Sequence, residues 1–179
     1  MFRKIVLVGP MGAGKTSLGK RLASRLKWQF FDTDHVVIKN SGADIPLIFE
    51  REGEAGFRRR EHAALKEVLE APMDAVIACG GGIVVTPENR SLIMTQPLVV
   101  FLDVSVERQL ERIGLDKNRP LIHVPDKRER LQHLRDERLG LYEGIADMRI
   151  DTDSNNFNLS FNRLYCGVKD FLQQDSLAQ

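Results

Sequence analysis

The sequence has 179 residues, of which 42% are hydrophobic, so it can bury a sizeable core, and we expect one domain over residues 1–179 with a small mobile insertion. A formal net charge of +1 gives no broad basic field, so nucleic acid is not expected as a partner. No apolar run reaches membrane-spanning length and the N-terminus lacks a signal-peptide pattern, which predicts a cytoplasmic protein with no membrane partner. The histidines and cysteines lack metal-ligand spacing, and we expect both cysteines, Cys79 and Cys166, in the core.

Short apolar runs alternate along the chain with segments of helical periodicity, the pattern of an α/β fold with a parallel sheet covered by helices. We expect five strands, at residues 5–8, 30–32, 75–79, 99–102 and 148–151. Thr86-Pro87 and Ser105 indicate helix starts, whereas Gly42 and Gly53 suit helix C-termini.

The first predicted strand runs directly into GPMGAGKT at residues 9–16, which matches the phosphate-loop pattern G-x-x-x-x-G-K-S/T in full. The glycines let backbone N–H groups wrap around an anion, and the following helix directs the positive end of its dipole at the same point. Lys15 would reach the outer phosphates of a nucleoside triphosphate, and Thr16 would supply a hydroxyl to Mg²⁺. A glycine-rich turn with an unrelated lysine is the alternative, but the complete motif in its strand–loop–helix context favours phosphate binding.

The second predicted strand ends in Asp32-Thr33-Asp34. Ligands of open α/β sheets bind at the carboxyl ends of the strands. Carboxylates two residues apart in an extended chain point to the same side, so one could serve a metal and the other a substrate hydroxyl. Helix capping is the alternative, and it is plausible for Asp34 taken alone.

The third predicted strand ends in Gly80-Gly81-Gly82, without the acidic residue that usually ends a Walker-B strand. That absence makes Asp32 the natural residue for the Mg²⁺ site. Glycines have no side chains to bury, so we expect the backbone here to approach a bound molecule closely. A bulged turn is the alternative, although it would not need three glycines.

Two arginines fall on otherwise apolar helix faces. Glu61 lies between Phe57 and Leu65 on one such face and needs a partner, which Arg58 can supply from three residues earlier. This pairing would hold the Arg58 guanidinium as a rigid fork for a carboxylate ligand. Arg138 falls on a second apolar stripe, where an uncompensated charge is costly, so we expect it to face an anion.

The segment 115–127 is polar, lacks helical periodicity and contains two prolines, which predicts a mobile loop. Arg119 lies in this loop, so it could reach transferring phosphates when the loop closes. From the loop alone, a solvated arginine is an equally good interpretation.

Together these residues resemble the shikimate kinase family over nearly the whole chain. The motifs that carry the resemblance are the loop 9–16, Asp32-Thr33-Asp34, Phe57-Arg58-Arg59 with Glu61, Gly80-Gly81-Gly82, Arg119-Pro120-Leu121, and Arg138 with Leu141-Tyr142. The resemblance implies a three-layer, nucleoside-monophosphate-kinase-like P-loop fold with strand order 2-3-1-4-5. It also implies a shikimate-binding region at about 33–61 and a lid at about 112–126.

The implied reaction transfers the γ-phosphate of ATP to the 3-hydroxyl of shikimate, giving shikimate 3-phosphate and ADP in the pathway to chorismate and aromatic amino acids. The partners are then ATP and shikimate, the cofactor is Mg²⁺, and we expect a monomer. The resemblance assigns shikimate to Asp34, Arg58, Gly80, Gly81, Gly82 and Arg138. It assigns ATP to Gly12, Ala13, Gly14, Lys15, Thr16, Ser17, Arg112 and Arg119, with Arg112 over the adenine. The resemblance places Asn155 or Phe157 at the adenine, and here the sequence departs from the family, since it reads Ser154-Asn155-Asn156-Phe157 where some members have a proline.

Mechanistically, Lys15, Arg119 and an Mg²⁺ held by Thr16 and Asp32 would neutralise the phosphates, and Asp34 would orient the hydroxyl and accept its proton. Gluconate or nucleotide kinase activity on the same fold is the nearer alternative, although the glycine turn and the Arg58/Arg138 pair favour shikimate. A GTP-dependent switch would need an N-K-x-D motif, which the sequence lacks.

Overall fold

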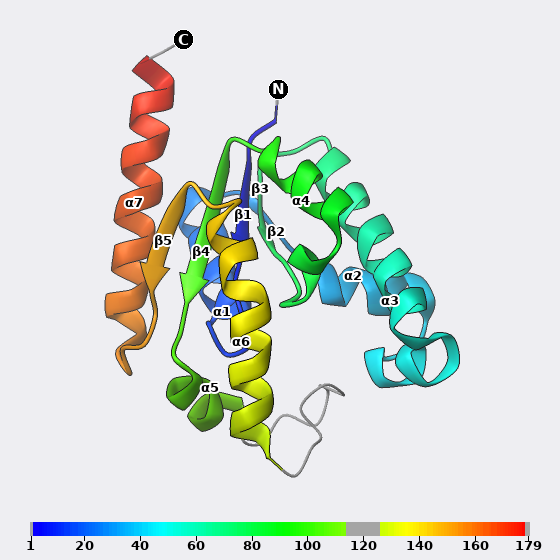
Figure 1. Ribbon diagram of the computed structural model, residues 1–179. Coiled ribbons are helices and arrows are strands. Elements are labelled where there is room, and N and C mark those ends of the chain that lie inside the picture. The colour runs from blue at the N-terminus through cyan, green and yellow to red at the C-terminus, as the bar shows by residue number, and fades with distance from the viewer. Residues whose placement is uncertain (1, 114–125, 178–179) are drawn as a thin grey trace.

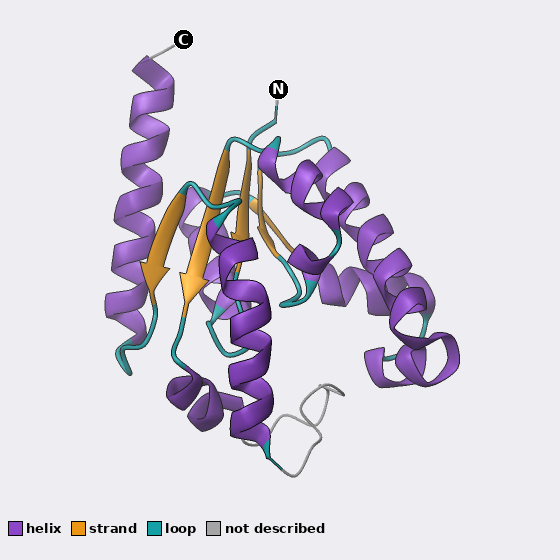
Figure 2. Cartoon of the chain, in the orientation of Figure 1, coloured by secondary structure: helices purple, strands orange, loops and turns teal. Residues whose placement is uncertain are grey.

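The computed structural model describes residues 2–113 and 126–177. Strands and helices alternate along most of the chain (Figures 1 and 2). The strands are β1 (Lys4–Val8), β2 (Gln29–Asp32), β3 (Ala75–Ala78), β4 (Leu98–Asp103) and β5 (Met148–Asp151). The helices are α1 (Lys15–Leu26), α2 (Thr33–Ser41), α3 (Ile45–Glu70), the 3₁₀ turn η1 (Ile83–Val85), α4 (Pro87–Met94), α5 (Val106–Ile113), α6 (Lys127–Glu143) and α7 (Phe157–Leu177).

The five strands form one parallel sheet in the order β2-β3-β1-β4-β5, which confirms the order that the resemblance implied. All five predicted strands are present, with ends shifted by one residue at most. The central strand β1 reads KIVLV, is buried at every position, and pairs on one side with β3 and on the other with β4. Such a continuous apolar run is typical of a strand covered on both faces.

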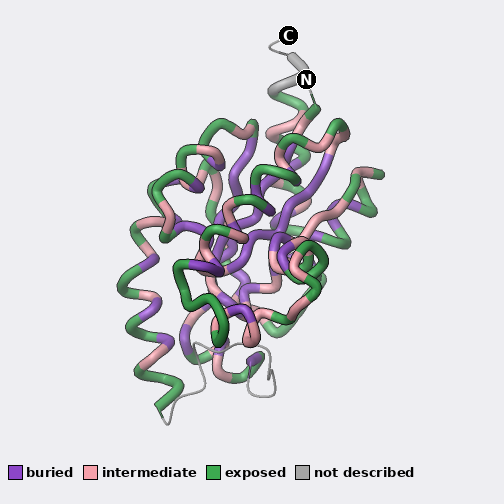
Figure 3. The backbone as a smooth tube through the Cα atoms, turned by 90° about the vertical axis from the view of Figure 1, so that its right-hand side faces the viewer, coloured by how far each residue is buried: buried purple, intermediate pink, exposed green. Residues whose placement is uncertain are grey.

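Helices cover both faces of the sheet and complete three layers (Figures 1 and 3). Alternate side chains of β1 enter separate cores because successive residues of a strand point to opposite faces. Ile5 and Leu7 pack with residues of α1 and α7, whereas Val6 and Val8 pack with residues of α3, α4 and α6. Of the two cysteines, Cys79 lies in the second core as expected, but Cys166 is exposed. The expectation for Cys166 was wrong because α7 buries only the stripe that carries Leu164 and Val168.

Helix ends follow the local sequence. Gly42 ends α2 in the left-handed conformation at φ 67°, and Ser105 caps α5 by accepting the N–H of Arg108 at 3.2 Å. Gly53 interrupts α3 with φ 68° and ψ −176°, a region that residues with a Cβ rarely adopt, so it ends one helical stretch and lets another begin.

Because all strands are parallel, their carboxyl ends lie along one edge of the sheet (Figure 2). The loops after β1, β2 and β3 therefore meet at that edge, as expected for a ligand cleft in an open α/β sheet. No helix in the described part of the chain is both long and apolar enough to cross a membrane.

Candidate active site

The phosphate loop links β1 to α1 in a conformation that its glycines permit. Gly9 has φ 141°, and a Cβ there would lie 2.2 Å from the carbonyl oxygen of Leu102, so a side chain would collide with β4. Gly14 occupies the N-cap position of α1 at φ 87° and has no capping side chain. The first turn of α1 consequently presents its N–H groups at the edge of the sheet where a phosphate would sit.

Lys15 is nearly buried at 9% exposure, and its ammonium group lies against the loop itself. Its Nζ donates to the carbonyl oxygens of Gly9 at 2.7 Å and Pro10 at 2.8 Å. The lysine charge is therefore fixed at the centre of the phosphate loop.

Asp32 uses both of its carboxylate oxygens. One accepts the Thr16 hydroxyl at 2.7 Å, and the other accepts the N–H groups of Asp34 at 3.1 Å and His35 at 3.4 Å. The capping aspartate of α2 is therefore Asp32 and not Asp34, which lies in the first turn of the helix. The capping alternative for Asp34 was wrong. The Asp34 side chain instead lines the cleft described next.

One cleft of about 270 Å³ brings the phosphate loop and both aspartates together. Its lining residues are Gly12, Gly14, Lys15, Thr16, Ser17, Asp32, Asp34, Cys79, Gly80, Gly81 and Arg112. Gly80 lies so close to Asp34 that a Cβ at residue 80 would come within 2.5 Å of its Oδ1. The Gly80 N–H also donates to the Thr33 hydroxyl at 2.9 Å, which fastens the glycine turn to the start of α2.

The expected pair of Arg58 and Glu61 is present on α3. Arg58 donates from Nη1 to Glu61 at 2.7 Å and from Nη2 to Glu54 at 3.0 Å. Glu61 is 1% exposed, and burial raises its pKa to about 7 despite the opposing effect of Arg58. A Cβ on Gly82 would lie 2.3 Å from Nη1 of Arg58, so the glycine turn lies directly on the guanidinium.

Arg138 is buried on α6, as expected from its place on an apolar stripe. Its Nε has no hydrogen-bond partner within the described parts of the chain, which is unusual for a buried charged side chain. Its charge acts on both Glu61 and the Tyr142 hydroxyl. Tyr142 in turn donates a hydrogen bond to the carbonyl oxygen of Gly81, and sequence reasoning had not given this tyrosine a role.

A second cavity of about 240 Å³ continues from the phosphate loop toward the end of β5. Arg112 lines both cavities and is held by backbone carbonyls, donating to Gly12 at 2.8 Å and Thr152 at 2.6 Å. Asn155 and Phe157, the two residues expected at the adenine, also line this cavity. The Asn155 side chain accepts a hydrogen bond from Arg108 at 2.6 Å.

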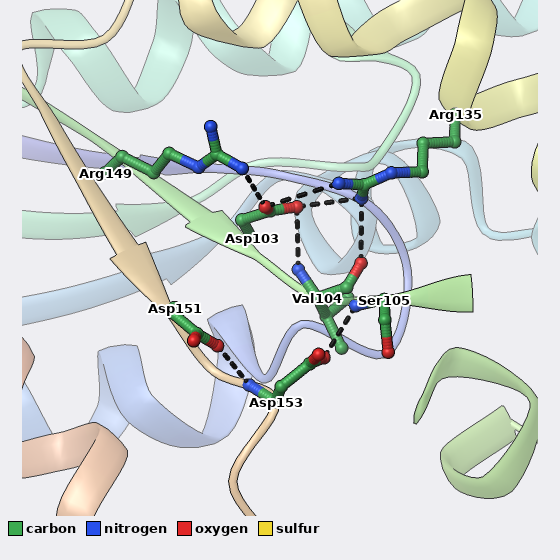
Figure 4. A pocket seen from close by; sticks show the side chains of 7 residues that line it. All are labelled: Asp103, Val104, Ser105, Arg135, Arg149, Asp151 and Asp153. Atoms are coloured by element: carbon green, nitrogen blue, oxygen red, sulfur yellow. Dashed lines mark hydrogen bonds and ion pairs between the residues drawn. The ribbon is translucent and has the colours of Figure 1, made fainter. Parts of the chain in front are cut away.

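A third cavity, of about 350 Å³, contains a network of charges that local sequence reasoning missed (Figure 4). Arg135 of α6 and Arg149 of β5 point at Asp103 from two sides, at 2.8 and 2.5 Å. Burial alone would raise the pKa of Asp103, but hydrogen bonds from the two arginines hold it below its ordinary value. The network joins the end of β4 to β5 and α6, and Arg135 also donates to the carbonyl oxygen of Val104, at the start of the segment that leads to α5.

Two expectations lie outside the described residues. The first is Arg119. The second is the lid expected at 112–126, of which the structure describes Arg112, Ile113 and Asp126.

The fold and the cleft define a P-loop kinase: a phosphate loop follows the central strand, the Asp32 carboxylate accepts the Thr16 hydroxyl, and Asp34 lines the same cleft. A sequence model of the family described as shikimate kinase matches residues 11–165. The chain belongs to the shikimate kinase family, phosphotransferases that use ATP and an alcohol acceptor. This excludes the alternatives of a gluconate kinase, a nucleotide kinase and a GTP switch.

Relatives and solved structures agree with this membership. The chain is 44% identical over 162 residues to the shikimate kinase of Francisella tularensis subsp. holarctica, covering 90% of this chain and 92% of the relative. It is 46% identical over 151 residues to that of Legionella pneumophila, covering 84% and 86%. A solved structure of shikimate kinase from Acinetobacter baumannii in complex with shikimate superposes with a TM-score of 0.89 at 38% identity, covering 99% and 96% of the two chains.

Proposed function

We propose that the cleft between the phosphate loop, Asp34 and the Gly80-Gly81-Gly82 turn is where this chain transfers the γ-phosphate of ATP to the 3-hydroxyl of shikimate. The observation that carries this proposal is the placement of two arginines, the half-buried Arg58 and the buried Arg138, around a glycine turn that adjoins Asp34. Phosphoryl transfer needs little covalent work from a protein, so alignment and charge neutralisation are the main tasks of such a cleft.

The phosphate side of the cleft is assigned to residues 12–17. The N–H groups at the start of α1 would surround the β-phosphate, and Lys15 would exchange its backbone carbonyl partners for phosphate oxygens. Arg112 and Asn155 would contact the nucleoside in the cavity beyond the loop. Arg119, assigned from the sequence, would approach the transferring phosphoryl group from the lid.

Thr16 and Asp32 fit a magnesium ion. A hydroxyl and a carboxylate within 2.7 Å of each other supply the oxygen ligands that Mg²⁺ prefers, and Mg²⁺ is commonly held by one or two such side chains together with substrate phosphates. When bound, Mg²⁺ would offset negative charge on the β- and γ-phosphates.

The acceptor side is built to hold an anionic alcohol. Arg58 and Arg138 would bind the carboxylate of shikimate, supported by the backbone of Gly80, Gly81 and Gly82. With the carboxylate fixed, the 3-hydroxyl would face Asp34, which would orient it and accept its proton as the phosphoryl group arrives.

The chain would act as a monomer, because a single copy carries every residue assigned above. It would be one domain and would work in the cytoplasm, as expected from the sequence. Residues 33–61 would form the shikimate-binding region and 112–126 the lid. Light scattering coupled to size-exclusion chromatography measures the assembly state directly, and a dimer would contradict this part of the proposal.

A coupled assay of ADP release tests the acceptor. We expect activity with shikimate and little with gluconate, quinate or nucleoside monophosphates. A second arm uses the shikimate analogue whose carboxylate is replaced by a neutral carboxamide. Arg58→Ala and Arg138→Ala should lose much less affinity for this analogue than for shikimate. Equal losses on both compounds would remove the two arginines from carboxylate recognition.

A further inference from the structure

Tyr142 is a buried residue of α6. Its ring packs in the core, and its hydroxyl makes a hydrogen bond to a distant part of the chain. The side chain is 2% exposed, and its ring stacks on Phe101 with centroids 5.1 Å apart. Packing of this kind would be served equally by phenylalanine. The hydroxyl, however, donates a hydrogen bond to the carbonyl oxygen of Gly81, which is 61 residues away in the sequence. A buried tyrosine hydroxyl is retained where it has a polar partner to hold.

The bond to Gly81 fixes a whole peptide unit. The Gly81 carbonyl and the Gly82 N–H belong to the same planar trans peptide, in which they point in opposite directions. Among the described residues, the Gly82 N–H has no hydrogen-bond acceptor. By holding the carbonyl, Tyr142 therefore sets the direction of the N–H donor of Gly82, the glycine that lies against Arg58. Glycine residues would otherwise leave this peptide free to rotate.

Tyr142 also lies beside the arginine groups. It follows Arg138 by four residues on α6, which puts both side chains on one helix face, and both are buried. The charges of Arg138, Glu61 and Arg58 all act on its hydroxyl. Gly82, on the other side of the fixed peptide, lies against the Arg58 guanidinium. One hydroxyl thus connects the helix of Arg138 with the turn that lies on Arg58.

We propose that Tyr142 is a positioning residue for the carboxylate of the acceptor: its hydroxyl locks the Gly81–Gly82 peptide in register with Arg138 and Arg58, so that the carboxylate meets donors already in place. This inference rests on the proposed assignment of the shikimate carboxylate to those arginines. Tyr142 is not proposed to touch the reacting atoms or the nucleotide.

The chain contains two tyrosines, which gives the test a matched control. Tyr165 is half-buried on α7 and stacks on Phe161, far along the chain from the glycine turn. Tyr142→Phe should raise KM for shikimate roughly 3- to 10-fold, the range expected for one lost hydrogen bond, while kcat and KM for ATP stay within about twofold. Tyr165→Phe should change none of the three constants. A Tyr142→Phe enzyme with unchanged KM for shikimate, or with equal changes in both KM values, overturns the proposal.

The carboxamide analogue separates this inference from the assignment on which it rests. If Arg138→Ala shows no preference between shikimate and the analogue, the carboxylate assignment itself is wrong. If Arg138→Ala loses affinity mainly for shikimate but Tyr142→Phe is impaired equally with both compounds, only the role of Tyr142 is wrong. We expect both variants to be impaired mainly with shikimate.

A spectroscopic measurement removes any dependence on how well Tyr142→Phe folds. Tyr165→Phe protein grown with 3-fluorotyrosine carries one fluorine label, at position 142. Its ¹⁹F resonance should shift when shikimate is added and should not shift with ADP alone. A resonance that ignores shikimate, or that responds equally to ADP, overturns the proposal.

Discussion

The Thr16 hydroxyl donates to the Asp32 carboxylate at 2.7 Å, while the second oxygen of the same carboxylate caps α2. One side chain therefore serves the start of a helix and the proposed metal site at once. The two roles depend on different properties, since a cap needs only an acceptor oxygen whereas a metal ligand gains from full negative charge.

Asp32→Asn separates these roles because asparagine caps helices about as well as aspartate but carries no charge. We expect the Mg²⁺ concentration for half-maximal activity to rise by about tenfold or more, with little change in the free energy of unfolding. Asp32→Ala should in addition lose about 1 kcal/mol of stability with the cap. A magnesium titration and urea unfolding of both variants measure these effects. An unchanged magnesium requirement in Asp32→Asn would show that the carboxylate does not serve the metal.

Asp34 is tested by an equally conservative change. Asp34→Asn should keep the fold and ATP affinity but lower kcat by about a hundred- to ten-thousand-fold, since an amide cannot accept the proton of the hydroxyl. Because Asp32 and not Asp34 caps α2, stability should be almost unchanged. Turnover is followed by ADP release and ATP affinity by calorimetry. Near-normal turnover would remove Asp34 from the chemistry.

The arginines should divide by role. Arg58→Ala or Arg138→Ala should weaken shikimate binding by about 1.5–3 kcal/mol, the value of a lost charge-assisted hydrogen bond, with a smaller effect on kcat. Arg119→Ala should chiefly lower kcat because a lid arginine acts on charge that develops during transfer. Arg59→Ala is the control, since Arg59 is exposed beside Arg58. Identical changes in KM and kcat for all three site variants would contradict this division.

Glu61 should make the free energy of unfolding decrease as the pH rises. Its pKa is about 7 in the folded chain, above the ordinary value of 4.5, because burial outweighs the attraction of Arg58. Between these values the folded state holds more protons than the unfolded state, so this residue's contribution is full below about pH 4.5 and declines as pH rises through 7. Compared with Glu61→Gln, the wild type should lose about 2–3 kcal/mol of stability between pH 4.5 and 8.

Urea unfolding of both proteins across that range checks the slope, and the absence of a difference in slope would contradict the raised pKa. Shikimate binding provides a second readout. Protonation of Glu61 removes the charge that holds Arg58, so KM for shikimate should increase below pH 7 in the wild type. In Glu61→Gln it should be high and nearly independent of pH.

Local features of this fold could be predicted from the sequence because their causes lie within a few residues. The five apolar runs are the five strands, and Arg58 pairs with Glu61 because three residues on a helix bring the side chains together. The strand order came from the family resemblance, since periodicity identifies strands without naming their neighbours.

Other features needed the structure because they join distant segments. In the Asp103 network, Arg135 and Arg149 lie 32 and 46 residues after Asp103 in the sequence. Tyr142 lies 61 residues after its hydrogen-bond partner Gly81. No spacing rule connects such residues before the strands are arranged. The capping role of Asp32 was also not predicted, because Asp32 and Asp34 are the same residue type and the strand pattern does not say at which of them the next helix begins.

The central position of β1 has a consequence for how the chain acquires its shape during synthesis. β1 precedes the other four strands of the sheet in the sequence, yet its partners are β3, about 70 residues later, and β4, later still. At ordinary translation rates of roughly 5–20 residues per second, β1 is without its two neighbouring strands for several seconds. The phosphate loop that follows β1 is therefore synthesised before either of the strands that hold β1 in the sheet.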